Sequence, residues 1–137
     1  MGYQTMVYAW WKYKNSQVRA KGERVKAERD AKEYPWLKEI DRESEILEMD
    51  VSQLRQGLMS GRFTSVDLVH VFARRCMQIG RRLCLSTEEN FEEALKLAVI
   101  RDEERTKALK DGTAHLLPPL HGIPISTKEM VTLRYFH

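Results

Sequence analysis

The chain has 137 residues, 42% of them hydrophobic and 31% charged, which is enough for one ordinary domain with a hydrophobic core. Its formal net charge of +3 is too small to indicate nucleic acid binding. No apolar run approaches the ~20 residues that span a bilayer, and Lys12 and Lys14 follow the first aromatic run rather than precede it, unlike the basic residues of a secretory signal.

The cysteines and histidines do not indicate a metal site. Cys76 and Cys84 lie eight positions apart, and the four histidines are scattered without the spacing of metal ligands. We therefore expect no metal and no cofactor. Two thiols in a chain of this size are typical of a reduced compartment, so we expect the protein in the cytoplasm or at the cytosolic face of a membrane.

Residues 3–32 combine aromatic and basic side chains. Five aromatic residues lie between Tyr3 and Tyr13, and the stretch from Lys12 to Lys32 holds eight Lys or Arg against three Asp or Glu. This composition is typical of an anchor at a membrane–water interface, which makes an anionic membrane surface the expected partner of residues 3–32. The alternative is a solvated basic helix whose aromatic end packs on its own domain. Nucleic acid is not an expected partner, because no base-reading module accompanies the basic residues.

The basic stretch is also a predicted helix. Residues 15–33 contain no proline and are rich in Ala, Glu, Lys and Arg. Tyr34-Pro35 ends this helix, because a residue before proline is pushed out of the helical region. Short helical pieces are expected over 36–48. Residues 1–49 thus form a predicted aromatic and basic arm, and residues 50–137 a separate predicted domain.

Two short helices begin this domain. Asp50 or Ser52 can cap a helix that Gly61 ends. Thr64 or Ser65 caps the next one, in which Asp67 opposes the positive end of the helix dipole. The apolar stripe of this second helix includes Cys76, which we expect in the core, and Gly80 ends the helix.

A short strand and a long helix follow. Leu83-Cys84-Leu85 is a candidate strand, and residues 88–110 form the clearest predicted helix. Its expected apolar face consists of Phe91, Leu95, Ala98, Val99 and Leu109. Asp102 falls on the same face, where an isolated carboxylate is costly. We therefore expect Asp102 to pair with Arg105 or to cap a helix N-terminus rather than to act in catalysis.

The last predicted element is a strand that leads to a lysine. Pro118 and Pro119 break the chain, after which Ile123 and Ile125 alternate with small or cyclic residues. Pro124 donates no backbone hydrogen bond, which favours an edge position or the start of a strand. Lys128 lies at the exit of this predicted strand.

This segment resembles the first catalytic block of the amidase signature family, serine hydrolases that cleave carboxamides. The matching residues are Gly122, Ile123, Pro124 and Ile125, followed by Lys128 and Glu129. Gly61-x-x-Thr64-Ser65 and the stretch from Ala94 to Asp102 extend the resemblance over about residues 50–129. It implies an α/β fold, of which this chain would form the mostly helical N-terminal portion, with two short strands and an extended basic N-terminal helix.

The family uses a Ser–Ser–Lys triad, and the resemblance assigns its lysine, the catalytic base, to Lys128. The two serines belong to a Gly/Ser-rich segment that these 137 residues do not contain. We do not expect Ser126 to be a nucleophile, since no glycine elbow or oxyanion loop accompanies it. The chain is therefore expected to be an N-terminal fragment, inactive alone, of an enzyme that acts on a small-molecule amide.

The arm adds a second resemblance, to the N-terminal region of fatty acid amide hydrolases. A basic helix, a Tyr-Pro break and an acidic stretch before the first domain helix carry it. It makes fatty acid amides the implied substrates. The alternative function is a non-catalytic helical module that binds a membrane or a partner through the arm. The sequence does not indicate an oligomeric state.

Overall fold

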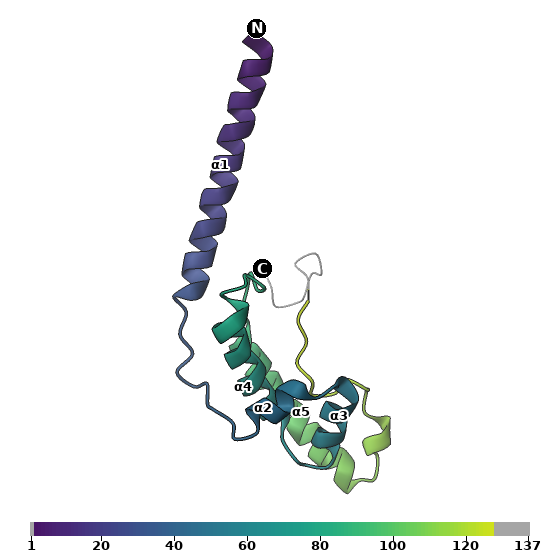
Figure 1. The fold of residues 1–137 in the computed structure, drawn as a ribbon. Helices are drawn as coiled ribbons and strands as arrows, with labels where there is room; N and C mark the ends of the chain where they lie inside the picture. Colours follow the sequence, from purple (N-terminus) through teal and green to yellow (C-terminus); the bar gives the residue numbers. More distant parts are fainter. Residues whose placement is uncertain (1, 128–137) are drawn as a thin grey trace. The chain divides into compact units, whose positions relative to one another are not determined.

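The computed structural model describes residues 2–127, which are largely helical (Figure 1). The elements in chain order are the α-helices α1 (Gly2–Asp30), α2 (Glu43–Glu48), α3 (Val51–Met59) and α4 (Ser65–Arg75), the π-helical turn η1 (Cys76–Gly80), the α-helix α5 (Phe91–Lys110) and the 3-10 turn η2 (Ala114–Leu116). They form two compact units that interleave along the sequence. Among the described residues, the first unit contains those up to Trp36 together with Cys76–Glu89, and the second contains Leu37–Arg75 and the stretch from Asn90 to Thr127.

Helix α1 dominates the first unit and confirms the extended basic N-terminal helix. Among residues 5–30, Arg29 alone is buried, and nearly all the others are exposed. The helix ends at Asp30, ahead of the Tyr34-Pro35 break that the sequence predicts as its limit. No helix in the described part of the chain is both long enough and apolar enough to cross a bilayer.

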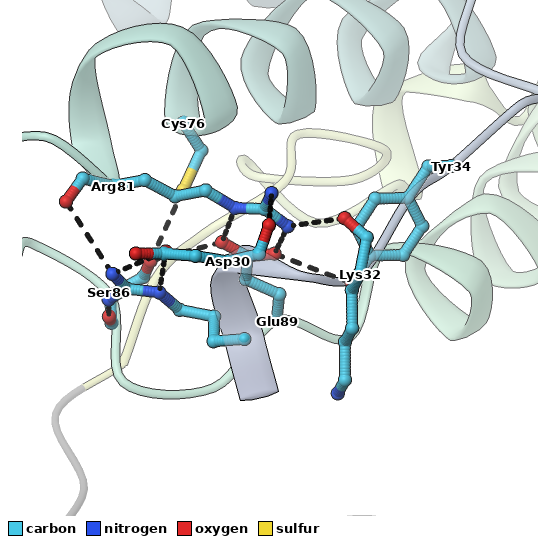
Figure 2. Close-up of polar contacts among 8 residues, drawn as sticks. Asp30, Lys32, Tyr34, Cys76, Arg81, Ser86 and Glu89 are labelled. Atoms are coloured by element: carbon cyan, nitrogen blue, oxygen red, sulfur yellow. Dashed lines mark hydrogen bonds and ion pairs between the residues drawn. The ribbon is translucent and has the colours of Figure 1, made fainter. Parts of the chain in front are cut away.

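The C-terminal end of α1 is held by a polar cluster that we call the basal clasp, formed by Arg29, Asp30, Arg81, Ser86 and Glu89 (Figure 2). Arg29 is 6% exposed, pairs with Asp30 and donates a hydrogen bond to the Ser86 carbonyl. Arg81 pairs with the fully buried Glu89 carboxylate at 2.6 Å. This hydrogen bond raises the pKa of the Arg81 guanidinium.

Arg81 also donates hydrogen bonds to backbone carbonyl groups at the C-terminal end of α1. Its guanidinium donates to the carbonyl oxygens of Asp30, at 3.3 Å, and of Lys32, at 3.1 Å. The last carbonyl groups of a helix have no hydrogen-bond partner within the helix, and they form the negative end of its dipole. A cation at this position is favourable because it donates hydrogen bonds to these carbonyls and is attracted by the dipole. The ring of Tyr34 lies beneath the same guanidinium, 5.9 Å away.

The second unit contains the hydrophobic core. The core side chains come from α2, α3, α4 and the α3–α4 loop: Ile46, Leu54, Leu58, Phe63, Leu68 and Val71. Phe63 lies against the backbone of Gly57, where a Cβ atom would overlap the ring. Helix α4 packs on both α2 and α5.

The helix caps follow the local rules that the sequence indicates. Asp50 and Gln53 form a reciprocal capping box at α3, with both hydrogen bonds at 2.8 Å. Gly61 follows this helix with a φ of +70°. Thr64 and Asp67 cap α4 in the same reciprocal way. Gly80 ends the π-helical turn that follows α4.

Several expected features are wrong. Neither short strand is present in the described residues, because residues 81–85 form hydrogen-bonded turns in which Cys84 has a φ of +54°, and 123–127 have no strand partner. Cys76 is half-buried and contacts the Ser86 hydroxyl at 3.5 Å instead of entering the core. The helix predicted over roughly 88–110 is confirmed as α5, which begins at Phe91 and ends at Lys110. The division of the chain at residue 50 stays a prediction.

Among the expected apolar residues of α5, Ala98 is buried and Phe91 and Leu95 are half-buried, but Val99 and Leu109 are exposed. The buried positions of the helix are Ala98, Arg105 and Ala108. The buried face of α5 therefore carries a cation between two small residues.

His70 makes the stability of the second unit depend on pH. Its buried ring accepts a hydrogen bond on Nδ1 from the backbone N–H of Lys38 at 3.2 Å. Burial, and next the Lys38 ammonium, lower the pKa of His70 from 6.5, while Asp67 opposes them. The native state thus favours the neutral ring. The contribution of this ring to the free energy of unfolding is complete above the unfolded-state pKa of about 6.5, and it is lost as the pH falls below that value.

We expect the free energy of unfolding to fall between pH 7 and pH 5, and to fall less steeply in His70→Gln, whose side-chain oxygen still accepts a hydrogen bond. Urea titrations at a series of pH values, followed by circular dichroism, measure this difference. An equally steep fall in the variant would show that His70 does not carry the pH dependence.

Candidate functional site

The segment that carries the motif begins with a pair of turns. The His121 N–H donates to the Pro118 carbonyl at 3.0 Å, and the Ile123 N–H donates to the Leu120 carbonyl at 3.1 Å. Beyond Ile123 the chain continues to Thr127 without regular structure (Figure 1). Lys128, the predicted catalytic base, lies outside the described residues, as does Glu129.

Gly122 sits at the tightest point of this segment. Its φ of +81° lies in the left-handed region, which favours glycine. A Cβ atom at this position would overlap the Ser65 hydroxyl and would lie 2.9 Å from Nη1 of Arg105. The glycine of the motif is therefore required both by its backbone conformation and by the close approach of α4 and α5.

The two residues that Gly122 approaches, Ser65 and Arg105, both contact Asp102 at the start of α4. The Asp102 carboxylate accepts hydrogen bonds from the backbone N–H groups of Ser65, at 2.8 Å, and Val66, at 3.2 Å. Arg105, one turn further along α5, pairs with Asp102 and donates to the Ser65 hydroxyl at 3.0 Å. Both expected partners of Asp102, Arg105 and a helix N-terminus, are thus confirmed.

His121 forms a second link between the motif and α5. Its Nε2 lies 2.9 Å from the Glu104 carboxylate, and its side chain is only 8% exposed. Hydrogen bonds from Arg101 and then from His121 lower the pKa of Glu104. The buried Nδ1 of His121 has no hydrogen-bond partner within residues 2–127.

The two isoleucines of the motif differ in their surroundings. Ile123 is half-buried and packs against the hydrophobic core, whereas Ile125 is 71% exposed. The expectation that both lie on the buried face of one strand is met only at Ile123. Ser126 is exposed as well. Contacts with α4, α5 and the core therefore hold the start of this segment, from His121 to Ile123.

The charged groups around the motif are suited to holding the backbone rather than to catalysis. Asp102, Arg105, Glu104 and His121 are all engaged with one another or with backbone groups. The described residues contain no cluster of His, Cys, Asp or Glu that could hold a metal ion. We conclude that this arrangement fixes the position at which the chain leaves the core toward Lys128.

The sequence is similar to three curated proteins with amidase names. One, from Schizosaccharomyces pombe and named as a putative amidase, is 33% identical over 85 residues. "Amidase 2" of Gibberella moniliformis is 29% identical over 86 residues, and a protein of Saccharomyces cerevisiae named "Probable amidase" is 32% identical over 87. These findings support a relationship to amidases.

The similar region makes up 62%, 63% and 64% of this chain in the three comparisons. It makes up only 15%, 16% and 14% of the three relatives. No protein-family model matches the sequence, and no solved structure matches the chain. The chain thus spans a small part of the length of the proteins that it resembles.

We expect Asp102→Ala to destabilise the protein by about 2 kcal/mol, because it leaves the guanidinium of the buried Arg105 without its carboxylate and two N–H groups of α4 without an acceptor. Denaturant unfolding monitored by circular dichroism measures the change. Glu103→Ala, at the exposed neighbouring position of the same helix, is the matched control and should change stability by less than about 0.5 kcal/mol. Equal effects of the two substitutions would contradict the assigned role of Asp102.

Proposed function

We propose that this chain is the N-terminal part of an amidase of the amidase signature family, which hydrolyses the C–N bond of carboxamides. The observation that carries the proposal is the similarity to three proteins with amidase names over 85–87 residues. The Gly122-Ile123-Pro124-Ile125 motif followed by Lys128 also supports it. The chain would supply the first catalytic block, and the rest of the enzyme would supply the remaining groups.

In this proposal Lys128 is the base of a Ser–Ser–Lys triad. Neutral Lys128 takes a proton from the bridging serine, which in turn takes one from the nucleophilic serine as that oxygen attacks the amide carbon. When the C–N bond breaks, the protons return along the same path to the leaving amine. Water then attacks the acyl-enzyme, releasing the carboxylic acid and restoring the serine. Backbone N–H groups outside this chain would stabilise the oxyanion.

A lysine can act as this base only in its neutral form. A free lysine has a pKa of about 10.4 and is charged at neutral pH, so the site must disfavour the ammonium through burial. Lys128 lies six positions after Gly122, and an extended chain spans at most about 21 Å over six positions. The contacts of Gly122 with Ser65 and Arg105 therefore limit where the lysine can be placed.

The chain by itself is proposed to be inactive. The nucleophile and the bridging serine of the triad belong to a Gly/Ser-rich segment that the 137 residues do not contain. The proposed substrates are small-molecule amides, and the resemblance of the arm to fatty acid amide hydrolases makes fatty acid amides the first to test. The alternative, a non-catalytic module that binds a membrane or partner, depends on the arm alone.

We expect the purified 137-residue chain to hydrolyse neither fatty acid amides nor simple carboxamides above the rate in buffer. Release of the amine, measured with excess protein over hours, tests this. Turnover that disappears in Lys128→Ala would contradict the proposed need for a Gly/Ser-rich segment, and would show that the triad lysine works with a nucleophile inside this chain.

The gene offers a second test of the same proposal. Sequencing of the transcript beyond codon 137 should show an in-frame, Gly/Ser-rich continuation in at least one product. If every transcript lacks one, the amidase proposal fails and the binding module becomes the better account.

A further inference from the structure

Four apolar side chains of α1, which we call the anchors, lie on one side of the helix. Val7, Trp10 and Trp11 stand at positions i, i+3 and i+4, and Val18 follows two turns after Trp11. At about 100° per residue, the four positions fall within about 100° of one another around the axis. All four side chains are exposed, by 47% to 69%. Apolar groups at this spacing are the pattern by which a helix binds in an apolar groove.

Positive charge surrounds the same part of the helix. Residues 12–26 contain six basic residues and one acidic residue, which gives a net charge of +5. Lys12 and Arg19 lie about 100° or more from the anchors in one direction around the axis, and Arg24 lies about 100° away in the other. Lys14 lies among the anchors, and its ammonium group is 5.6 Å from the ring of Trp10. The helix therefore presents basic groups on three of its sides.

Most of this charge has no partner within the described residues. Arg24 pairs with Glu28 at 3.4 Å, and both side chains are exposed. Four other cations of the stretch form no ion pair among residues 2–127: Lys12, Arg19, Lys21 and Lys26. The basal clasp lies beyond the stretch, at Arg29 and Asp30. Residues 7–26 are thus open to a partner that does not disturb the clasp.

The distribution of charge indicates what kind of partner fits. Two copies of α1 would repel each other through their like charges, which disfavours a second copy of this chain. A flat anionic surface would meet one side of the helix and leave the other basic groups in water. An acidic partner that encloses the helix would meet the anchors and all three basic sides at once, so charge complementarity favours an enclosing partner.

We propose that residues 7–26 of α1 are the binding site for an acidic protein that encloses the helix in an apolar groove, the chemistry of a calcium-loaded EF-hand sensor. Such sensors open when they bind calcium and expose a groove lined by methionines, whose flexible side chains adapt to different anchors. Basic amphipathic helices are typical targets of these proteins. The anchors enter the groove, and the basic side chains meet carboxylates around it. This site is separate from the proposed amidase chemistry and does not rest on it.

Isothermal titration calorimetry of the full chain, with calmodulin as the probe, tests the proposal. In calcium we expect binding of one calmodulin per chain with a Kd of about 1 μM or lower. Removal of calcium with a chelator should abolish binding, because the groove then closes. Failure of the wild-type chain to bind in calcium, or equal binding with and without calcium, would overturn the proposal.

The anchors have their own test. Trp11→Ser/Val18→Ser should weaken binding at least about tenfold, since two apolar side chains leave the groove. Ala9→Ser/Ala20→Ser is the matched control, because both positions are exposed on the opposite side of the same helix. It should change binding less than about twofold. Circular dichroism and urea unfolding should match the wild type for both variants. Wild-type affinity in the anchor variant would overturn the proposal.

The basic residues are tested by charge reversal. Arg19→Glu/Lys21→Glu should weaken binding at least about tenfold at low salt, and the loss should shrink in about 0.5 M salt, where charges are screened. Lys107→Glu/Lys110→Glu makes the same change of net charge at two exposed positions of α5 and should leave binding unchanged. Equal losses in the two variants would show that net charge, rather than a site on α1, causes the binding.

Tryptophan fluorescence and lipid vesicles complete the test. Calcium-loaded calmodulin should shift the tryptophan emission to shorter wavelength, and Trp10→Phe/Trp11→Phe should remove the shift, because the anchors enter an apolar groove. A shift that persists in this variant would contradict the assignment of the anchors. Co-sedimentation with vesicles of phosphatidylcholine and phosphatidylserine examines a lipid surface. Binding to these vesicles without calcium-dependent binding to calmodulin would overturn the proposal in favour of an anionic membrane.

Discussion

The carboxylate of Asp102 at the N-terminus of α4 is the interaction on which the arrangement of the motif depends. It satisfies two N–H groups that the helix itself leaves unpaired, and it neutralises the buried Arg105. Through these contacts one side chain of α5 fixes the start of α4. Arg105 of this ion pair and the Ser65 hydroxyl line the space that Gly122 occupies, and only a residue without a side chain fits there. Removal of this interaction would therefore disturb the helix pair and the motif together.

The helical part of the structure could largely be predicted from the sequence, because helix ends obey local rules. Asp50 with Gln53, and Thr64 with Asp67, cap their helices through residues three positions apart, and Gly61 ends a helix by its backbone freedom. The pairing of Asp102 was predictable for a different reason. A lone carboxylate on an apolar face needs a partner, and Arg105 lies one turn away.

The features that sequence reasoning missed depend on distant residues. A strand needs a neighbouring strand, so alternation at Ile123 and Ile125 could not establish one, and residues 83–85 form turns instead. The contact of His121 with Glu104 joins positions 17 apart across a loop and leaves no local signal. The basal clasp likewise joins α1 to a segment about 50 residues away, through Arg29 and Arg81. Arg29 and Arg105 are buried in the structure, and an arginine is seldom buried without partners, but their burial is not visible in the sequence.

The two units carry separate parts of the functional account. The second unit holds the segment from His121 to Ile123 through contacts with α4, α5 and the core, and the first contains a helix whose residues Tyr8, Trp10 and Trp11 are exposed. The central claim is that Lys128 is the base of an amidase. Its most direct test is carboxamide hydrolysis by the longest translation product of the gene. We predict that Lys128→Ala lowers kcat by at least about 100-fold while Lys107→Ala, at an exposed position of α5, leaves it unchanged. Equal kcat values for the Lys128→Ala variant and the wild type would contradict the account.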